Sequence, residues 1–191
     1  MHPDILKYMY NHPEKFKKLD LTEAYFGLNS VMSIDVAEFT DFLLDKGFNP
    51  LLYMQKVPTC FLEESRYDKE DTFIVPSNIK EIDRSAFEKS LFKRIMISEG
   101  CEVIKGLAFK EMPNLEELYF PKSLKELGML VCIKCRNLKA IHYPGTYEEF
   151  QDIKNASKED YFEWYKSDAG RANDKCILIC SDQTVKLGIN I

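Results

Sequence analysis

The chain has 191 residues, 45% of them apolar and 30% charged, which is enough to bury the core of one compact domain. Its 31 acidic and 26 basic side chains give a formal net charge of −5, which argues against the basic surface of a nucleic-acid binder. No apolar run of membrane-spanning length and no secretory leader is visible, so we expect a cytoplasmic protein without membrane contact. Six cysteines are too few for a disulfide scaffold.

Residues 1–57 carry no repeat and are predicted to be helical. In "SIDVAEFTDFLLDKG", Asp35 can cap a helix over residues 36–46, and Gly47 is well placed to end it. Short helices are expected before it, on either side of His12-Pro13. Two interpretations stay open: the region caps the apolar edge of the first repeat, or it forms a separate binding lobe.

From Val75 onward the chain repeats itself. Successive units begin at Val75, Ile97, Phe120 and Tyr143, and the first unit is one residue shorter than the others, with the gap after Ser90. Columns of similar residues run through the units: Ile82, Ile104 and Leu127; Ala86, Ala108 and Val131; Phe87, Phe109 and Cys132; Phe73, Ile95, Leu118 and Ile141. The segment "KVPTCFLEES" can add a degenerate strand before the first clear unit.

This period, together with the kernel L-x-x-L-x-L in "FKRIMI", "LEELYF" and "LKAIHY", is typical of a leucine-rich repeat. Each unit supplies a short strand and a short helix or turn, and stacked units share one core. The predicted fold class is therefore an α/β repeat, a short solenoid of three to four units over residues 58–143. A helical N-terminal cap over residues 1–57 and a helix-plus-strand cap over residues 144–191 complete the division into domains.

Four cysteines follow the pattern C-x-x-C…C-x-x-x-C, which raises the question of a zinc site or a redox pair. They are Cys132, Cys135, Cys176 and Cys180. Because Cys132 falls in the column of Phe87 and Phe109, we expect Cys132 and Cys135 to fill the core as buried thiols, with no metal or cofactor. A metal- or thiol-dependent protein that uses all four cysteines remains the alternative.

The columns resemble the bacterial surface-antigen type of leucine-rich repeat, often called BspA-like. "VPSNIKEIDRSAF" is similar to the I-P-x-x-V-x-x-I-G-x-x-A-F segment of that family, and "CRNLKAI" is similar to its C-x-x-L-x-x-I segment. "YPGTYEEFQDI" and "KCILICSDQTV" resemble its capping helix and closing strand, although Phe150 replaces the usual tryptophan and residues 157–174 form a longer insertion. The resemblance, over residues 72–190, implies a structural Cys135, recognition of other proteins without catalysis, and a bacterial or bacteriophage source.

The residues themselves also favour binding over catalysis. His2, His12 and His142 have no convincing catalytic partner, and no glycine-rich phosphate loop is present. Outward strand positions align as two rows: Ile74, Met96, Tyr119 and His142 in one, and Thr72, Arg94, Glu117 and Ala140 in the other. Such an apolar row either binds a partner or is covered by the N-terminal segment or the insertion.

The predicted function is therefore a non-enzymatic interaction protein that binds another protein, with a host enzyme or defence protein as the candidate target. The predicted contact residues are Ile74, Arg94, Met96, Glu117, Tyr119 and His142 on the strand face, and Tyr161, Phe162, Trp164 and Tyr165 in the insertion. A self-assembling structural component is a further alternative.

Overall fold

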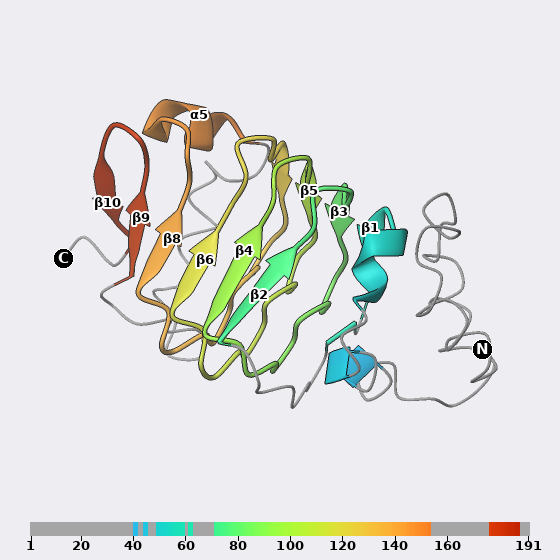
Figure 1. The fold of residues 1–191 in the computed structure, drawn as a ribbon. Coiled ribbons are helices and arrows are strands. Elements are labelled where there is room, and N and C mark those ends of the chain that lie inside the picture. The colour runs from blue at the N-terminus through green and yellow to red at the C-terminus, as the bar shows by residue number, and fades with distance from the viewer. Residues whose placement is uncertain are drawn as a thin grey trace, which may run out of the picture.

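The computed structural model describes residues 40–41, 44–45, 49–59, 61–62, 71–153 and 176–187, which coil into a β-solenoid with two sheets (Figure 1). The four-stranded sheet has the order β1-β3-β5-β7, and the six-stranded sheet has the order β10-β9-β8-β6-β4-β2. Every pair of neighbouring strands is parallel except β9 and β10. The predicted repeat solenoid is confirmed, and each full coil contributes one strand to each sheet.

The bounds of the elements follow the repeat. The four-stranded sheet consists of β1 (Lys56–Val57), β3 (Glu81–Ile82), β5 (Val103–Ile104) and β7 (Glu126–Leu127). The six-stranded sheet consists of β2 (Thr72–Val75), β4 (Arg94–Ile97), β6 (Glu117–Tyr119), β8 (Ala140–His142), β9 (Ile177–Ile179) and β10 (Thr184–Lys186). The described helical elements with complete bounds are the 3-10 helix η1 (Pro50–Tyr53) and the α-helix α5 (Tyr147–Asp152).

The strand register confirms the spacing of the units. Thr72 pairs with Arg94, and Arg94 pairs with Glu117, so the second step along the chain is one residue longer than the first. Lys89 and Glu111 occupy equivalent turn positions with positive φ, and they are as far apart in the sequence as Thr72 and Arg94. The missing residue of the first unit therefore lies between Lys89 and Arg94, which agrees with the deletion predicted after Ser90.

Between the sheets, each coil bends through a turn rather than a helix. Two non-glycine residues of every turn have left-handed φ values of 55° to 63°: Ser85 and Lys89, Leu107 and Glu111, Leu130 and Lys134. Such a conformation costs each residue about 1 kcal/mol or more. Hydrogen bonds between coils hold it in place, as Phe87 N–H donates to Ala108 O at 2.8 Å and Phe109 N–H donates to Val131 O at 2.8 Å.

The space enclosed by the coils is filled by the predicted columns. Phe87 stacks on Phe109 with ring centroids 5.4 Å apart, and Phe73 meets Phe87 edge-on at 5.5 Å. Both Phe87 and Phe109 are fully buried, and Cys132 continues their column at 3% exposure. Alternation along the strands sends Ile95 and Ile97 inward and Met96 outward, as predicted.

At the N-terminal end, the degenerate strand predicted in "KVPTC" is present as β1, which pairs with β3. The buried side chains of Leu51 and Met54 cover the first coil, and the Asn78 side chain donates to both of their carbonyl oxygens, at 2.7 and 2.6 Å. Of the helix predicted over residues 36–46, the structure describes four residues, all of them helical: Thr40, Asp41, Leu44 and Asp45. The predictions for residues 1–35 lie outside the described residues.

At the C-terminal end, α5 forms where the sequence resembles a capping helix. Thr146 and Glu149 build a capping box, in which each side chain accepts from the backbone N–H of the other residue. Phe150, the residue in place of tryptophan, is 2% exposed and packs edge-on against Tyr143 at 5.4 Å. Beyond β8, β9 and β10 close the sheet as an antiparallel pair.

Candidate functional site: the outer face of the six-stranded sheet

The outer face carries the predicted apolar row. The register pairs Ile74 with Met96, Met96 with Tyr119, and Tyr119 with His142. Ile74 is 57% exposed and Met96 is 39% exposed, whereas Tyr119 and His142 are half-buried. Large apolar side chains that lie side by side on a surface are a common feature of protein-binding sites.

Tyr119 and His142 form the most ordered part of this row. Their rings stack with centroids 4.1 Å apart and planes within 4° of each other. The Tyr119 hydroxyl donates to a carboxylate oxygen of Glu117, and this hydrogen bond, followed by burial, raises the pKa of Tyr119 above its usual value. The two rings are therefore fixed by contacts within the protein, so a partner would bind them without ordering them first.

Glu117 connects the apolar row to the second predicted row. Arg94 Nε lies 3.6 Å from Glu117 Oε2, and His142 Nε2 lies 4.0 Å from the same oxygen. His142 Nε2 is buried and has no hydrogen-bond partner among the described residues. The second row ends in Ala140, which is 8% exposed and offers little surface for contact.

The face extends one strand beyond the predicted residues. The register aligns Ile179 with His142 and Ile177 with Ala140, so β9 adds two half-buried isoleucines. Sequence reasoning missed them because β9 follows β8 only after residues 143–176, outside the repeat period. The alternation in "ILI" was the available signal.

The four cysteines of the C-x-x-C…C-x-x-x-C pattern are free and buried. Cys132, Cys135, Cys176 and Cys180 are at most 8% exposed. Cys135 Sγ donates to Phe109 O at 2.9 Å, so its S–H joins two coils. Burial raises the pKa of Cys176 to about 12 and the pKa of Cys135 well above its usual value, which leaves almost no reactive thiolate at neutral pH.

No group of three or more metal-ligating side chains lies together in the described part of the chain. The prediction that Cys132 and Cys135 are buried in the core is confirmed. These buried thiols act as small apolar side chains that fill space between the coils.

Outside the core, charged columns alternate in sign from coil to coil, a pattern that sequence reasoning missed. The largest column runs Asp71, Lys93, Glu116, Lys139, with contacts of 2.9 Å between Lys93 and Asp71 and 2.8 Å between Lys139 and Glu116. Two shorter columns are Lys80, Glu102 and Lys125, and Lys89, Glu111 and Lys134. In a parallel stack, identical charges would repel, so alternation favours this register.

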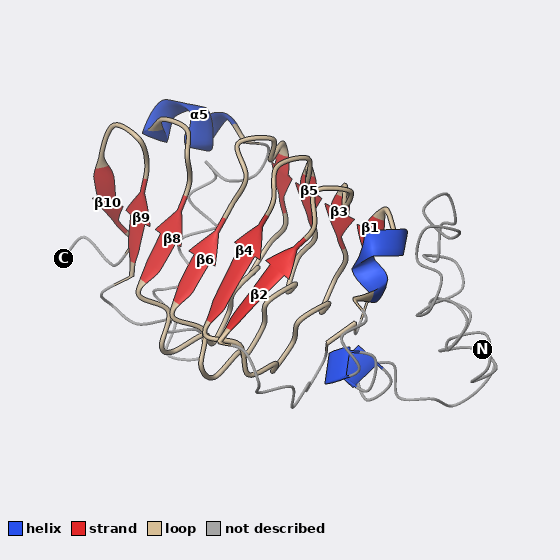
Figure 2. Cartoon of the chain, viewed as in Figure 1, coloured by secondary structure: helices blue, strands red, loops and turns tan. Residues whose placement is uncertain are grey.

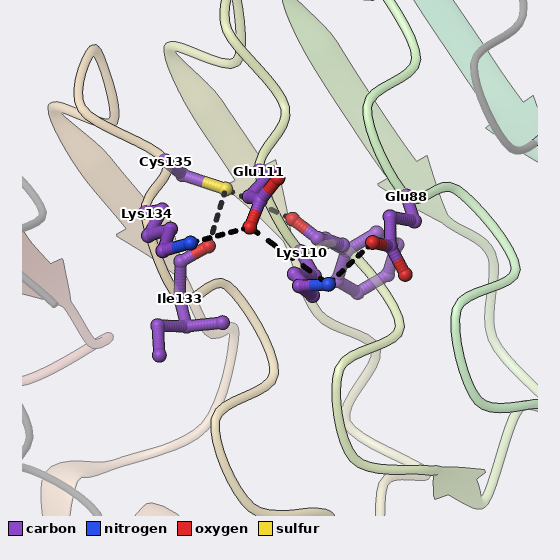
Figure 3. A network of polar contacts seen from close by, with 7 residues as sticks. Glu88, Lys110, Glu111, Ile133, Lys134 and Cys135 are labelled. Atoms are coloured by element: carbon purple, nitrogen blue, oxygen red, sulfur yellow. Dashed lines mark hydrogen bonds and ion pairs between the residues drawn. The ribbon is translucent and has the colours of Figure 1, made fainter. Parts of the chain in front are cut away.

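Neighbouring residues of the turns between the sheets form further contacts between opposite charges. Lys134 Nζ lies 2.6 Å from Glu111, and Lys110 Nζ lies 2.5 Å from Glu88 and 3.8 Å from Glu111 (Figure 3). The hydrogen bond from Lys134 lowers the pKa of the Glu111 carboxyl.

The other predicted contact residues, Tyr161, Phe162, Trp164 and Tyr165, lie outside the described residues.

No helix among the residues that the structure describes is long and apolar enough to cross a membrane. Comparison with curated proteins and with solved structures gave no match. Comparison with protein families gave one, the BspA type leucine-rich repeat region, in 6 copies over residues 65–157. Leucine-rich repeats are stacked scaffolds whose extended surfaces serve binding. Residues 65–157 therefore match the BspA type of leucine-rich repeat, which agrees with the resemblance of the repeat columns.

Proposed function

We propose that the protein is a non-catalytic interaction module that binds another protein through the outer face of its six-stranded sheet. The exposed pair Ile74 and Met96 carries this proposal, because they lie next to each other on adjacent strands and are 57% and 39% exposed. Soluble proteins rarely leave such neighbours uncovered without a use for them.

The surroundings of the pair support binding to a protein. Arg94 and the Tyr119–His142 stack flank it, and arginine and aromatic side chains are enriched among residues that dominate binding energy. The charged rim formed by Arg94 and Glu117 would orient the partner, while the apolar row would supply most of the affinity.

Affinity capture from bacterial lysate tests the proposal, with proteins identified by mass spectrometry. The variant carries Met96→Asp and Tyr119→Asp, which place two carboxylates on the apolar row. We expect the captured protein to be lost, because each burial of an unpaired carboxylate at an interface costs several kcal/mol. The matched control is Met129→Asp, since Met129 is 57% exposed but lies outside both sheets.

Two results would contradict the proposal: the double variant captures the same protein as the wild type, or Met129→Asp loses it equally. Circular dichroism of all three proteins must first show the same thermal transition. This comparison separates loss of the binding surface from loss of the fold.

The proposed function can be made more specific in two respects, the kind of partner and the part played by the insertion at residues 157–174. We propose that the partner is a host enzyme or defence protein, and that Tyr161, Phe162, Trp164 and Tyr165 add to the contact. An activity assay of the captured protein, with and without this chain, tests the first part. Reduced capture by Trp164→Ala is expected from the second part, and unchanged capture would remove the insertion from the contact surface.

A further inference from the structure

The two sheets do not begin at the same coil. In the four-stranded sheet, β1 lies beyond β3 at the N-terminal end, so the first full coil is covered there (Figure 2). In the six-stranded sheet the order ends at β2, and none of the described strands lies beyond it. Within the described residues, one edge of β2 is therefore unpaired, whereas the corresponding edge of β3 pairs with β1.

The backbone of β2 shows which groups this edge offers. Asp71 O accepts from Arg94 N–H at 2.9 Å, and Val75 O accepts from Ser98 N–H at 3.1 Å, so residues 71, 73 and 75 face β4. Since successive residues of a strand direct their N–H and C=O groups to opposite sides, those of Thr72 and Ile74 face the open edge. These are the groups that an added strand would pair with.

The opposite edge of the same sheet is protected. It ends in β10, a three-residue strand that is antiparallel to β9 and has an exposed Lys186. A short edge strand with lysine is a device that discourages pairing with other chains. By contrast, β2 has four residues, "TFIV", without a charge, and Ile74 is 57% exposed.

The chain itself shows how a strand fits at this end. On the neighbouring sheet, β1 places Lys56 against Glu81, with Nζ 3.3 Å from Oε1, and places Val57 in register with Ile82. The added strand thus puts a cation opposite a carboxylate and an aliphatic side chain opposite an aliphatic one. The charged column Asp71, Lys93, Glu116, Lys139 follows the same rule, and it ends at Asp71, which is 58% exposed in its side chain.

We propose that the β2 edge binds an extended segment of another protein by parallel strand addition. The segment carries Lys or Arg opposite Asp71 and an aliphatic side chain or methionine three residues later, opposite Ile74. Backbone hydrogen bonds to Thr72 and Ile74 supply affinity, and the two side-chain positions supply specificity. This site goes beyond the proposed face binding, because its partner extends the sheet instead of covering it.

Two peptides taken from the chain test the proposal with a built-in control. "FKRIMIS", the sequence of residues 92–98, places lysine opposite Asp71 and methionine opposite Ile74. "LEELYFP", the sequence of residues 115–121, has the same length but places glutamate opposite Asp71. Fluorescence anisotropy of labelled peptides should show saturable binding of the first, at least fivefold tighter than binding of the second.

Asp71→Lys is the decisive variant, because it should reverse this order and make "LEELYFP" the tighter ligand. Ile74→Pro removes an edge N–H without touching the hydrogen bonds to β4, so it should abolish binding of both peptides at unchanged thermal stability. The Met96→Asp, Tyr119→Asp double variant should still bind "FKRIMIS", which keeps this test separate from that of the proposed function.

Three results would overturn the proposal. The first is equal affinity of the two peptides, or no binding of either. The second is an unchanged order in Asp71→Lys. The third is a concentration-dependent dimer of the full chain in sedimentation that Ile74→Pro dissociates, since the edge would then be occupied by a second copy.

Discussion

The first coils of the solenoid stack phenylalanine rings in the core (the aromatic part), whereas the last repeat coil and its C-terminal neighbour place buried cysteines there (the thiol part). A single column makes the contrast, because Phe87 and Phe109 stack at 5.4 Å and Cys132 occupies the next position. Phe73 and Phe92 add further ring contacts to the aromatic part. In the thiol part, Cys135 and Cys176 are fully buried.

The two parts of the core are stabilised by different interactions. Large rings contribute buried area and dispersion, so the aromatic part depends on side-chain volume. The thiol part buries less area per residue and adds a directional contact, the S–H of Cys135 donating to Phe109 O. Four predictions break or sharpen this comparison, from the largest expected effect to the smallest.

Phe109→Ala should lower the free energy of unfolding by about 3–5 kcal/mol, because it leaves a cavity between stacked coils. Cys132→Ala, in the same column, should cost about 1 kcal/mol, because far less volume is removed. Urea denaturation of both variants measures the two free energies. Equal losses would show that the column is not packed as described.

Gly128→Ala should cost about 2–3 kcal/mol, because the boundary between the two parts has no room for a methyl group. A Cβ at Gly128 would lie 2.0 Å from the backbone nitrogen of Gly106. Met129→Ala is the neighbouring control, and its exposed side chain should change stability by less than about 0.5 kcal/mol. Thermal unfolding of the two variants measures this difference. A Gly128→Ala protein as stable as the wild type would contradict the prediction.

Alkaline pH should destabilise the protein through its buried thiols. The pKa of Cys176 is raised from 9.0 to about 12 by burial, so the folded state retains a proton that the unfolded state loses. The stability from this group is complete below pH 9 and is lost as the pH rises through 12, at about 1.4 kcal/mol per pH unit.

Urea denaturation at pH 8 and pH 10.5 tests this expectation. The Cys176→Ala variant should lose less stability between the two pH values than the wild type does. Burial also raises the pKa of Cys101 to about 12 and raises the pKa values of Cys135 and Cys180, so these thiols contribute in both proteins. An identical loss in wild type and variant would exclude Cys176 as a source.

Glu111→Gln should have the smallest effect, about 0.5 kcal/mol, because Glu111 and its partner Lys134 are partly exposed. The loss should shrink in 1 M salt, which screens such pairs. Because the pKa of Glu111 is lowered, its contribution is present above the ordinary value of 4.5 and is lost as the pH falls. Asp152→Asn, at the exposed end of α5, is the control, and an equal effect of both variants would contradict the role of the column.

The repeat, its register and the burial of Cys132 could be predicted from the sequence, because spacing alone determines which residues stack. The turns could not, since the left-handed φ of Leu107 and Glu111 belongs to residues that carry no turn signal, and the hydrogen bonds between coils impose it. The charged columns follow the same repeat spacing, so the sequence contained the signal for them although they were not predicted. Ile179 was missed because β9 stands outside the period.

The alternating charges also restrict how this protein can change length during evolution. The signs repeat every second coil, so duplication or loss of a single unit would bring Lys93 next to Lys139, or a glutamate next to a glutamate. Gain or loss of two units together would leave every contact between opposite charges intact. Homologues of different length should therefore differ by even numbers of coils, or should carry reversed charges at the junction.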